Sequence, residues 1–241
     1  YRYDLANRLK GVDNPDGSIT EYEFDSCGNI KLEYCVTDRY TEKTSFFYDS
    51  ENRLLMKDGA SAVTMQYDKN GNLIKRTDGI GQAAAVSHFG YDAFGRLTSF
   101  SSDSANAKYT YNPEGMRSGK TVNEISTRYI YDNGNILSSV SDGSYTSYNR
   151  GTELISVSQY GKEKLYYQTD SHGDVTALHT SDGTEAHSYQ YTAYGDEVRA
   201  AHPSFGENVT SQLWQTEVTA DQNPFRYCGE YTDPETGLIY L

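Results

Sequence analysis

Aromatic residues recur at every second position in many short segments of the chain. Phe46 and Tyr48 are one such pair, and Tyr129 and Tyr131 are another. Residues two positions apart share one face of a β-strand. The residues between them are mostly polar or small, so the opposite face can contact water. Because no window of the sequence shows a convincing period of 3.6 residues, the pattern predicts an all-β chain of short strands.

A seven-residue unit recurs where these segments end, and its clearest copies are residues 67–73 and 91–97. It reads aromatic, Asp, two variable positions, Gly or Asn, Arg or Asn, aliphatic. Asp suits the first position of a type I turn because its carboxylate accepts a hydrogen bond from the backbone N–H two residues on. Gly and Asn tolerate the positive φ that is frequent at the fourth position. Each unit is therefore predicted to be the corner of a β-hairpin, with the aromatic and aliphatic residues as a cross-strand pair worth roughly 0.2–1 kcal/mol.

The unit returns at a spacing of about 20 residues, which indicates a repeat architecture. One period then holds two short strands and two turns, and dipeptides such as Asp142-Gly143 and Asp182-Gly183 supply the second turn. The sequence therefore predicts repetitive antiparallel β-hairpins that form a curved or spiral sheet. The residues that define the repeat are Tyr3, Asp4, Phe24, Asp25, Gly28, Tyr48, Asp49, Tyr67, Asp68, Gly71, Tyr91, Asp92, Gly95, Tyr111, Gly115, Tyr131 and Asp132.

Composition narrows the class of protein. The chain has 241 residues, enough for a sizeable core, and 23 tyrosines, which suit half-buried sheet surfaces. Its net charge of −13 argues against a nucleic-acid partner, which needs clustered Lys and Arg. No apolar run approaches the ~20 residues of a membrane span. Residues 201–221, with the single Trp214, break the repeat rhythm and are predicted to form a helical or irregular insert.

Several residue types suggest sites, and for each we favour a structural role. Asp233 and Glu235 form an acidic pair, but Asp-Pro-Glu-Thr-Gly is typical of a turn. His179 and His187 straddle a predicted turn, and an exposed polar pair is favoured over a metal site. The Asp-x-x-Gly turns lack the dense oxygen ligands of a calcium loop.

The cysteines, Cys27, Cys35 and Cys228, have no metal-binding spacing. A disulfide between Cys27 and Cys35 requires that their strands be neighbours, and the odd number leaves at least one thiol outside any bridge. We predict no catalytic, cofactor-binding or metal-binding residues.

The unit resembles the YD repeat of the Rhs (rearrangement hot spot) family, and three C-terminal segments strengthen this resemblance. Residues 167–178 resemble the segment that opens the Rhs-associated core, residues 189–195 resemble its YxYDAFG motif, and residues 223–241 resemble its NPFRYxGxYxDxETGLxYL motif. We therefore predict a YD-repeat β-sheet array over residues 1–160 and a core-like segment over residues 161–241. The core-motif residues are Tyr191, Gly195, Pro224, Phe225, Arg226, Tyr227, Gly229, Tyr231, Asp233, Gly237 and Leu238.

The resemblance implies a fold and a function. Known Rhs and TcC-type proteins, and the teneurin ectodomains, wind YD-repeat sheets into a large hollow shell. In bacterial polymorphic toxins the shell encloses a C-terminal toxin, and the Rhs core caps it. We therefore expect a non-catalytic part of such a shell, secreted or at the bacterial cell surface, whose partners are the rest of the shell and an enclosed toxin. No cofactor, nucleic acid or membrane span is expected.

Two alternative functions stay open. Exposed tyrosines can stack on sugar rings, so the repeat surface is a candidate for binding cell-surface glycans. Many Rhs proteins also cut themselves after the core at an aspartate-protease-like site, whose aspartates the resemblance places in a segment that we expect to follow Leu241. We accordingly expect a piece of a longer polypeptide that does not cleave itself by this route.

Arg226, in the core-like segment, is expected to pair with an acidic neighbour in a structural role and not a catalytic one.

Overall fold

The computed structural model describes residues 1–14, 17–198 and 223–241. These residues form short β-strands joined by turns, and their helical segments are two 3₁₀ turns, which confirms the predicted all-β class. No helix among them is long and apolar enough to cross a membrane. The predicted insert at 201–221, with Trp214, lies outside the described residues. The chain divides into two compact units, unit 1 (Tyr1–Ser104) and unit 2 (Ala105–Leu241).

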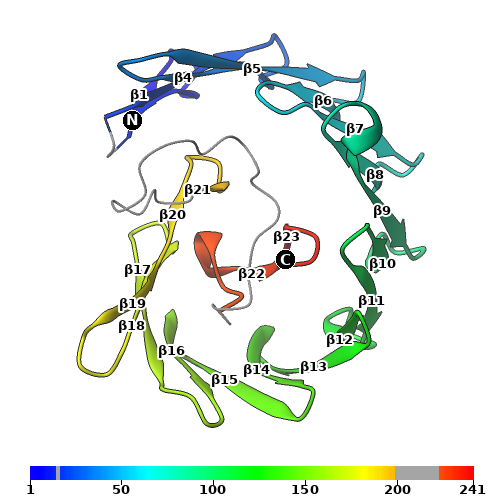
Figure 1. Cartoon of the computed structure of the whole chain (residues 1–241), viewed down its shortest axis with the longest axis vertical. Coiled ribbons are helices and arrows are strands. Elements are labelled where there is room, and N and C mark those ends of the chain that lie inside the picture. The colour runs from blue at the N-terminus through cyan, green and yellow to red at the C-terminus, as the bar shows by residue number, and fades with distance from the viewer. Residues whose placement is uncertain (15–16, 199–222) are drawn as a thin grey trace. The chain divides into compact units, whose positions relative to one another are not determined.

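Unit 1 is a ladder in which each strand pairs antiparallel with the next strand along the chain (Figure 1). This order follows from tight turns, because a short connection brings consecutive strands side by side. A 3₁₀ turn, η1 (Gly81–Ala83), lies between β8 and β9. The strands are β1 (Arg2–Tyr3), β2 (Leu9–Asp13), β3 (Ile19–Phe24), β4 (Ile30–Val36), β5 (Thr41–Tyr48), β6 (Leu54–Asp58), β7 (Val63–Tyr67), β8 (Leu73–Asp78), β9 (Ala85–Tyr91) and β10 (Leu97–Ser101).

Unit 2 begins with a second ladder of the same kind, from β11 to β19. Two small hairpins follow, and the C-terminal hairpin with the 3₁₀ turn η2 lies on the concave side of this ladder (Figure 1). The elements are β11 (Asn106–Tyr111), β12 (Arg117–Val122), β13 (Ile125–Asp132), β14 (Asn135–Ser141), β15 (Ser144–Arg150), β16 (Leu154–Gln159), β17 (Leu165–Thr169), β18 (Val175–His179), β19 (Glu185–Ser188), β20 (Gln190–Tyr191), β21 (Glu197–Val198), η2 (Tyr227–Gly229), β22 (Tyr231–Asp233) and β23 (Leu238–Tyr240).

The corners between strands follow the predicted turn chemistry. In the unit 67–73, the Asp68 carboxylate accepts hydrogen bonds from the backbone N–H groups of Asn70 and Asn72, each at 2.9 Å. Gly71 closes the turn with its N–H on the Asp68 carbonyl and has a φ of 88°. Asn52 takes the same place in another unit with a φ of 61°. The predicted cross-strand pair is confirmed, because Tyr67 lies opposite the aliphatic residue of its unit.

The unit that begins at Tyr131 is one residue shorter and turns differently. Asn133 and Gly134 both have positive φ, 48° and 82°, as a two-residue hairpin turn requires. Asp132 therefore pairs with Asn135 at the end of the ladder instead of occupying the turn. The predicted turn at Asp142-Gly143 is of the same two-residue type, with φ values of 46° and 74°.

A one-residue bulge follows the corner in most repeats. In the unit 67–73, Tyr67 lies opposite Leu73 and Gln66 lies opposite Lys75, so Ile74 is the extra residue. The same shift occurs after the Tyr111 corner, where Ser118 is the extra residue. A bulge bends its strand and increases the local twist. It also changes which later residues share a face, and this shift positions the charged residues described below.

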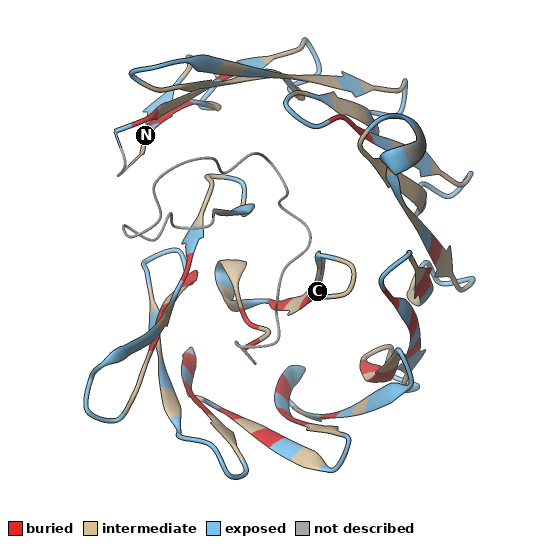
Figure 2. Cartoon of the chain, in the orientation of Figure 1, coloured by how far each residue is buried: buried red, intermediate tan, exposed pale blue. Residues whose placement is uncertain are grey.

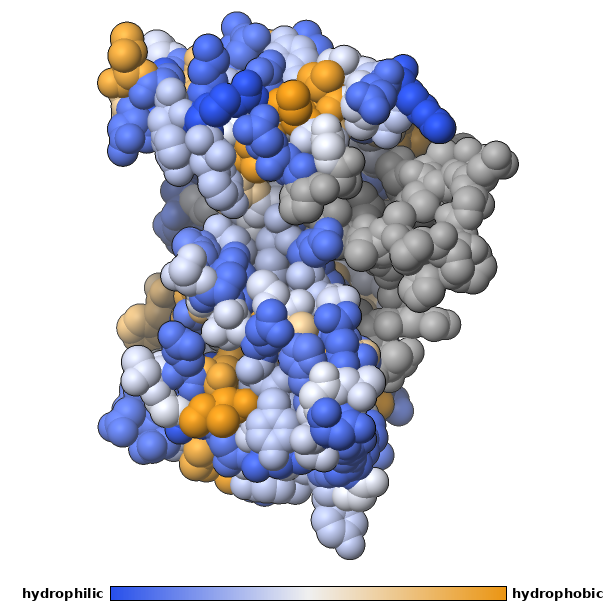
Figure 3. Space-filling model, turned by 90° about the vertical axis from the view of Figure 1, so that its left-hand side faces the viewer, coloured by the Kyte–Doolittle hydropathy of each residue, from blue (hydrophilic) through white to orange (hydrophobic). Residues whose placement is uncertain are grey.

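The two units differ in how much of their apolar surface is buried (Figure 2). Most of the buried hydrophobic residues belong to unit 2. On the face drawn in Figure 3, hydrophobic residues occur in small separate groups among hydrophilic ones. The core of unit 2 lies between its ladder and the C-terminal segment, by which we mean residues 223–241. It consists of Tyr129, Ile136, Tyr148, Leu154, Val157, Val175, Leu178, Tyr189, Phe225 and Tyr231.

The three cysteines, all within the described residues, form no disulfide. Cys35 lies in β4 opposite Thr20, whereas Cys27 lies in the preceding turn, so the condition for a Cys27–Cys35 bridge, that the two residues lie on neighbouring strands, is not met. The compact units divide at Ser104 and Ala105. The boundary predicted at residue 160 separates types of motif and not compact units, and it stays a prediction.

Candidate functional site

The tyrosine that opens a repeat unit is hydrogen-bonded to the unit before it. The Tyr67 hydroxyl donates to the carbonyl of Leu54, the aliphatic residue of the preceding unit, at 2.9 Å. Arg53 of that preceding unit also stacks on the Tyr67 ring, 5.3 Å from its centroid. The sequence predicted pairs within units but not these contacts between units. Equivalent hydroxyl donations join Tyr48 to Ile30, Tyr131 to Arg117 and Tyr191 to Val175.

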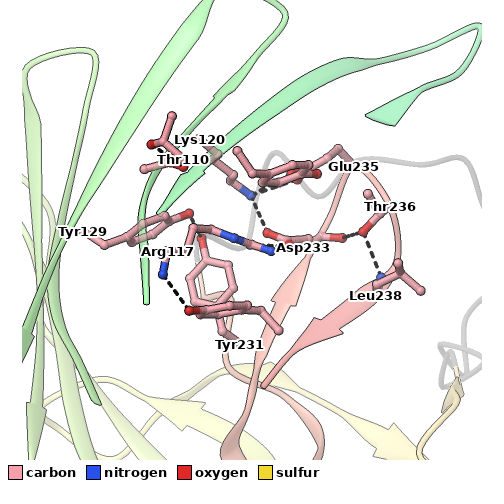
Figure 4. Close-up of polar contacts among 12 residues, drawn as sticks. Thr110, Arg117, Lys120, Tyr129, Tyr231, Asp233, Glu235, Thr236 and Leu238 are labelled. Atoms are coloured by element: carbon pink, nitrogen blue, oxygen red, sulfur yellow. Dashed lines mark hydrogen bonds and ion pairs between the residues drawn. The ribbon is translucent and has the colours of Figure 1, made fainter. Parts of the chain in front are cut away.

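A buried charge network joins the C-terminal hairpin to β12 (Figure 4). We use this name for Arg117, Lys120, Asp233 and Glu235. Arg117 pairs with Asp233 at 2.5 Å, and Lys120 contacts Asp233 at 2.9 Å and Glu235 at 2.8 Å. The four side chains are between 1% and 8% exposed. Two cations and two anions balance one another, which a buried ionic cluster requires if it is not to strongly destabilise the fold.

The bulge in β12 makes this arrangement possible. Arg117 and Lys120 are three residues apart, so in a regular strand their side chains would point to opposite faces. Ser118 is the extra residue of the bulge, and it returns both cations to the face that carries the C-terminal hairpin.

Tyrosines surround the buried charge network. The Arg117 guanidinium lies between the rings of Tyr109 and Tyr240, 4.5 and 4.1 Å from their centroids. The Tyr109 hydroxyl donates to Glu235 at 2.8 Å. Burial and the nearby Glu235 carboxylate raise the pKa of Tyr109, so this residue stays a hydrogen-bond donor. Burial opposes the charge of Arg117, but the attraction of Asp233 outweighs it and raises the pKa of the guanidinium.

Aromatic contacts hold the rest of the C-terminal segment. The Phe225 ring meets Tyr148 edge to face with centroids 5.0 Å apart, and it meets Tyr231 in the same way at 5.7 Å. The hydroxyls of Tyr129 and Tyr231 are hydrogen-bonded at 2.9 Å. Arg226 lies over the Tyr189 ring at 4.2 Å. These contacts fix the segment against several strands of the unit 2 ladder.

Several residues of the predicted core motif have clear local roles. Asp233 and Gly237 close the predicted turn, because the Gly237 N–H donates to the Asp233 carbonyl at 2.8 Å. Arg226 makes the predicted structural ion pair, with Glu197 at 3.4 Å. Gly195 has a φ of 89°, and a side chain there would collide with the ring of Tyr227.

The two histidines considered as a metal pair do not face each other. His187 lies opposite Leu178, and the ring of His179 is hydrogen-bonded to Gln168 at 2.8 Å. A different cluster, which the sequence did not suggest, contains His172, Asp174 and Cys228. The Nδ1 of His172 lies 3.1 Å from a carboxylate oxygen of Asp174 and 3.7 Å from the Sγ of Cys228.

Electrostatics give the members of this cluster different characters. The hydrogen bond that the His172 ring donates to the Asp174 carboxylate raises the pKa of His172. Burial and the Asp174 charge raise the pKa of the Cys228 thiol. A reactive cysteine needs a lowered pKa, so the cluster does not have the character of an activated nucleophile.

Sequence reasoning also missed the cationic half of the buried charge network. One signal was present, because Arg117 occupies the seventh position of its unit, where the repeat calls for an aliphatic residue. A charge at a position that is half-buried in other units points to a buried partner.

Comparison with known proteins gives a consistent assignment. The family model described as teneurin YD-shell matches residues 1–241. The tRNA3(Ser)-specific nuclease WapA of Bacillus spizizenii is 32% identical over 248 residues, which cover 99% of this chain and 10% of that protein. The double-stranded DNA deaminase toxin A of Burkholderia cenocepacia is 24% identical over 275 residues, which cover 100% of this chain and 18% of that protein. The chain thus spans between a tenth and a fifth of the length of these relatives.

Among solved structures, the crystal structure of TcdB2-TccC3-Cdc42 aligns with a TM-score of 0.46 and 15% identity, over 99% of this chain and 17% of that chain. The family match carries the assignment, because it extends over the whole length of the sequence. With its repeated aromatic–Asp corners and its C-terminal core motif, the chain belongs to the teneurin YD-shell family.

Proposed function

We propose that this chain is a non-catalytic wall segment of a YD shell that, in a longer protein, encloses and helps deliver a C-terminal toxin. The observation that carries the proposal is that relatives with different activities share this segment. A tRNA nuclease and a DNA deaminase toxin both match nearly the whole of this chain. A segment common to proteins with different reactions is better explained by a shared structural task than by either reaction.

The architecture of each unit supports the same proposal. Consecutive hairpins pair along a ladder, so unpaired strand edges are confined to the ends of each ladder. The tyrosine hydroxyls add a second connection between neighbouring repeat units. Such a sheet is suited to enclosing another segment of chain and not to forming a single deep reaction site. Because the matching relatives come from bacteria, we also propose a secreted or cell-surface location in a bacterium.

The surroundings of Asp233 and Glu235 support a non-catalytic role. An aspartate-protease site needs two carboxylates close enough to share one proton. Here each carboxylate is paired with a buried cation, Asp233 with Arg117 and Glu235 with Lys120. Both anions are thereby neutralised as ion pairs, which suits attachment of the C-terminal hairpin.

Protease protection in the full-length protein that carries this segment tests the enclosure. The native protein is digested, and the region after the segment is followed by mass spectrometry. We expect that region to resist cleavage in the native protein and to be cleaved once the shell is unfolded by urea. Cleavage at the same rate in both states would overturn the proposal. The intact mass of the chain during long incubation tests the non-catalytic part, and a specific internal cut would contradict it.

Glycan binding is the second candidate, and one observation favours it. Tyr145 and Tyr160 are 46% and 91% exposed, and the Tyr160 N–H donates to the Tyr145 carbonyl at 3.2 Å. Residues opposite each other in an antiparallel pair carry their side chains on the same face, so these two exposed tyrosines are placed to stack on sugar rings. Polysaccharide pull-down that is lost in Tyr145→Ala and Tyr160→Ala, but kept in Tyr40→Ala, which changes an exposed tyrosine of unit 1, would support this function. Equal binding by all three variants would rule out this surface.

A further inference from the structure

Three side chains of the types that bind transition metals meet where two turns of unit 2 pack together. His172 and Asp174 belong to the turn between β17 and β18, and Cys228 belongs to η2. Their ligand atoms all lie within 4.8 Å of one another. The His172 side chain is 57% exposed, so an ion can reach the cluster from solvent. The Asp174 side chain is 11% exposed and is held in place by its surroundings.

The backbone fixes the two turns relative to each other. The Val175 N–H donates to the Arg226 carbonyl at 3.1 Å, and the Cys228 N–H donates to the Asp174 carboxylate at 2.7 Å. Gly173 and Gly229 shape the two turns, because their φ values of 88° and 66° lie in the left-handed region that glycine adopts without strain. The ligand atoms are therefore already assembled, without any rearrangement of the chain.

The backbone conformation of Cys228 is a second, independent indication. Its φ of 53° lies in the left-handed region, which strains every residue with a side chain other than Asn or Asp. Turn chemistry alone would place Gly or Asn at this position. Left-handed strain at a residue whose thiolate can bind a metal ion points to a use for that side chain.

The distances fit a metal ion better than a nucleophilic site. In a Cys–His–Asp nucleophile, the thiol and the carboxylate contact different nitrogens of the imidazole. Here both approach Nδ1. For a tetrahedral Zn²⁺ site, the usual bond lengths place S and N about 3.6 Å apart and N and O about 3.4 Å apart. The observed separations are 3.7 Å and 3.1 Å, close to both values.

We propose that His172, Asp174 and Cys228 bind Zn²⁺ or a similar thiophilic divalent cation through Nδ1, a carboxylate oxygen and Sγ, with water in a fourth position. Binding replaces the thiol proton of Cys228 by the metal and releases that proton to solvent. The ion connects the β17–β18 turn to the C-terminal segment, whose sequence positions are 56 residues apart. It would therefore stabilise the attachment of this segment, in addition to the buried charge network. This inference departs from the sequence prediction of no metal ligands.

Titration of the metal-free chain with Co²⁺, in a buffer with a phosphine reductant, tests the proposal. Co²⁺ bound to a thiolate gives a charge-transfer band in the near ultraviolet, so we expect this band to saturate at one equivalent and to disappear when Zn²⁺ is added. Cys228→Ser should lose the band, and His172→Ala should weaken binding at least ~10-fold. Cys27→Ser, which changes an exposed thiol outside the cluster, should keep both the band and the affinity. The proposal fails if the wild-type chain gives no saturable band, or if Cys228→Ser retains it.

Alkylation of the wild-type chain provides a test that needs no variant. We expect one equivalent of Zn²⁺ to slow the modification of Cys228 by iodoacetamide, measured by peptide mass spectrometry, and to leave Cys27 unchanged. Equal rates at Cys228 with and without Zn²⁺ would overturn the proposal, even if metal binds elsewhere on the chain.

Discussion

At the scale of single residues, the hydroxyl that joins neighbouring repeat units distinguishes Tyr from Phe at the first position of the unit. Tyr67→Phe keeps the ring but removes the donor to the Leu54 carbonyl. We expect the free energy of unfolding in urea to fall by about 1 kcal/mol, the usual net value of such a hydrogen bond. Tyr160→Phe, at a position 91% exposed, should change it by less than ~0.5 kcal/mol. Equal losses in the two variants would show that the hydroxyl bond does not stabilise the ladder.

A second residue-scale prediction concerns the turn that contains Asp182. A hydrogen bond from the Thr180 hydroxyl, helped by the Thr184 backbone N–H, lowers the pKa of Asp182 to about 2. Because the folded value lies below the unfolded value of about 3.9, this carboxylate stabilises the turn above about pH 4. That contribution is lost as the pH falls from about 4 towards 2. NMR titration of the Asp182 carboxyl carbon should report the low pKa.

Thr180→Val serves as the matched control for this titration. It removes the hydroxyl that is the largest cause of the shift, so the pKa of Asp182 should rise towards about 3.9. An unchanged pKa in Thr180→Val would assign the shift to another cause.

At the scale of elements, the buried charge network predicts strong coupling between β12 and the C-terminal hairpin. Asp233→Ala leaves Arg117 without its partner in a site where the Asp233 side chain is 1% exposed. Loss of one partner of a buried ion pair typically costs 3–5 kcal/mol, and we expect a loss of about this size in urea unfolding. The double variant Arg117→Met with Asp233→Leu removes both charges and keeps the Lys120–Glu235 pair. It should recover most of the loss.

Arg76 and Asp78 supply a matched control on β8. They pair at 2.7 Å with side chains 17% and 22% exposed, so Asp78→Ala should cost only about 0–1 kcal/mol. If Asp233→Ala and Asp78→Ala had the same effect, or if the double variant were no more stable than Asp233→Ala, the network would not couple the two elements.

The elements also show how much the sequence could predict. Hairpin corners were predictable because their chemistry is local: Asp68 and Gly71 determine one turn within four residues. The bulge at Ser118 was not, since nothing in its residue type marks it as the extra residue. The partner of Arg117 could not be predicted either, because Arg117 and Asp233 are 116 residues apart and no local pattern connects them.

At the scale of the whole molecule, the two compact units bury their apolar residues differently. Unit 1 has fewer buried hydrophobic residues than unit 2, and the C-terminal segment of unit 2 covers the core of that unit. Regions with few buried apolar contacts open at lower free energy. We therefore expect backbone amides of unit 1 to exchange with deuterium faster than those of the unit 2 ladder, measured by mass spectrometry on peptides from each unit.

Phe225 makes this difference testable by a single substitution. This residue is 2% exposed, and its ring contacts Tyr148 and Tyr231 in the covered core of unit 2. Phe225→Ala should cost about 3–5 kcal/mol, because truncating a buried aromatic residue loses apolar burial and leaves a cavity. Exchange should then accelerate in the unit 2 ladder, while unit 1 amides change little, because the substitution leaves the contacts of unit 1 intact. Equal acceleration of exchange in both units would contradict the prediction that the effect stays within unit 2. It would mean that the chain opens as one cooperative block, and that the C-terminal segment stabilises more than the ladder it covers.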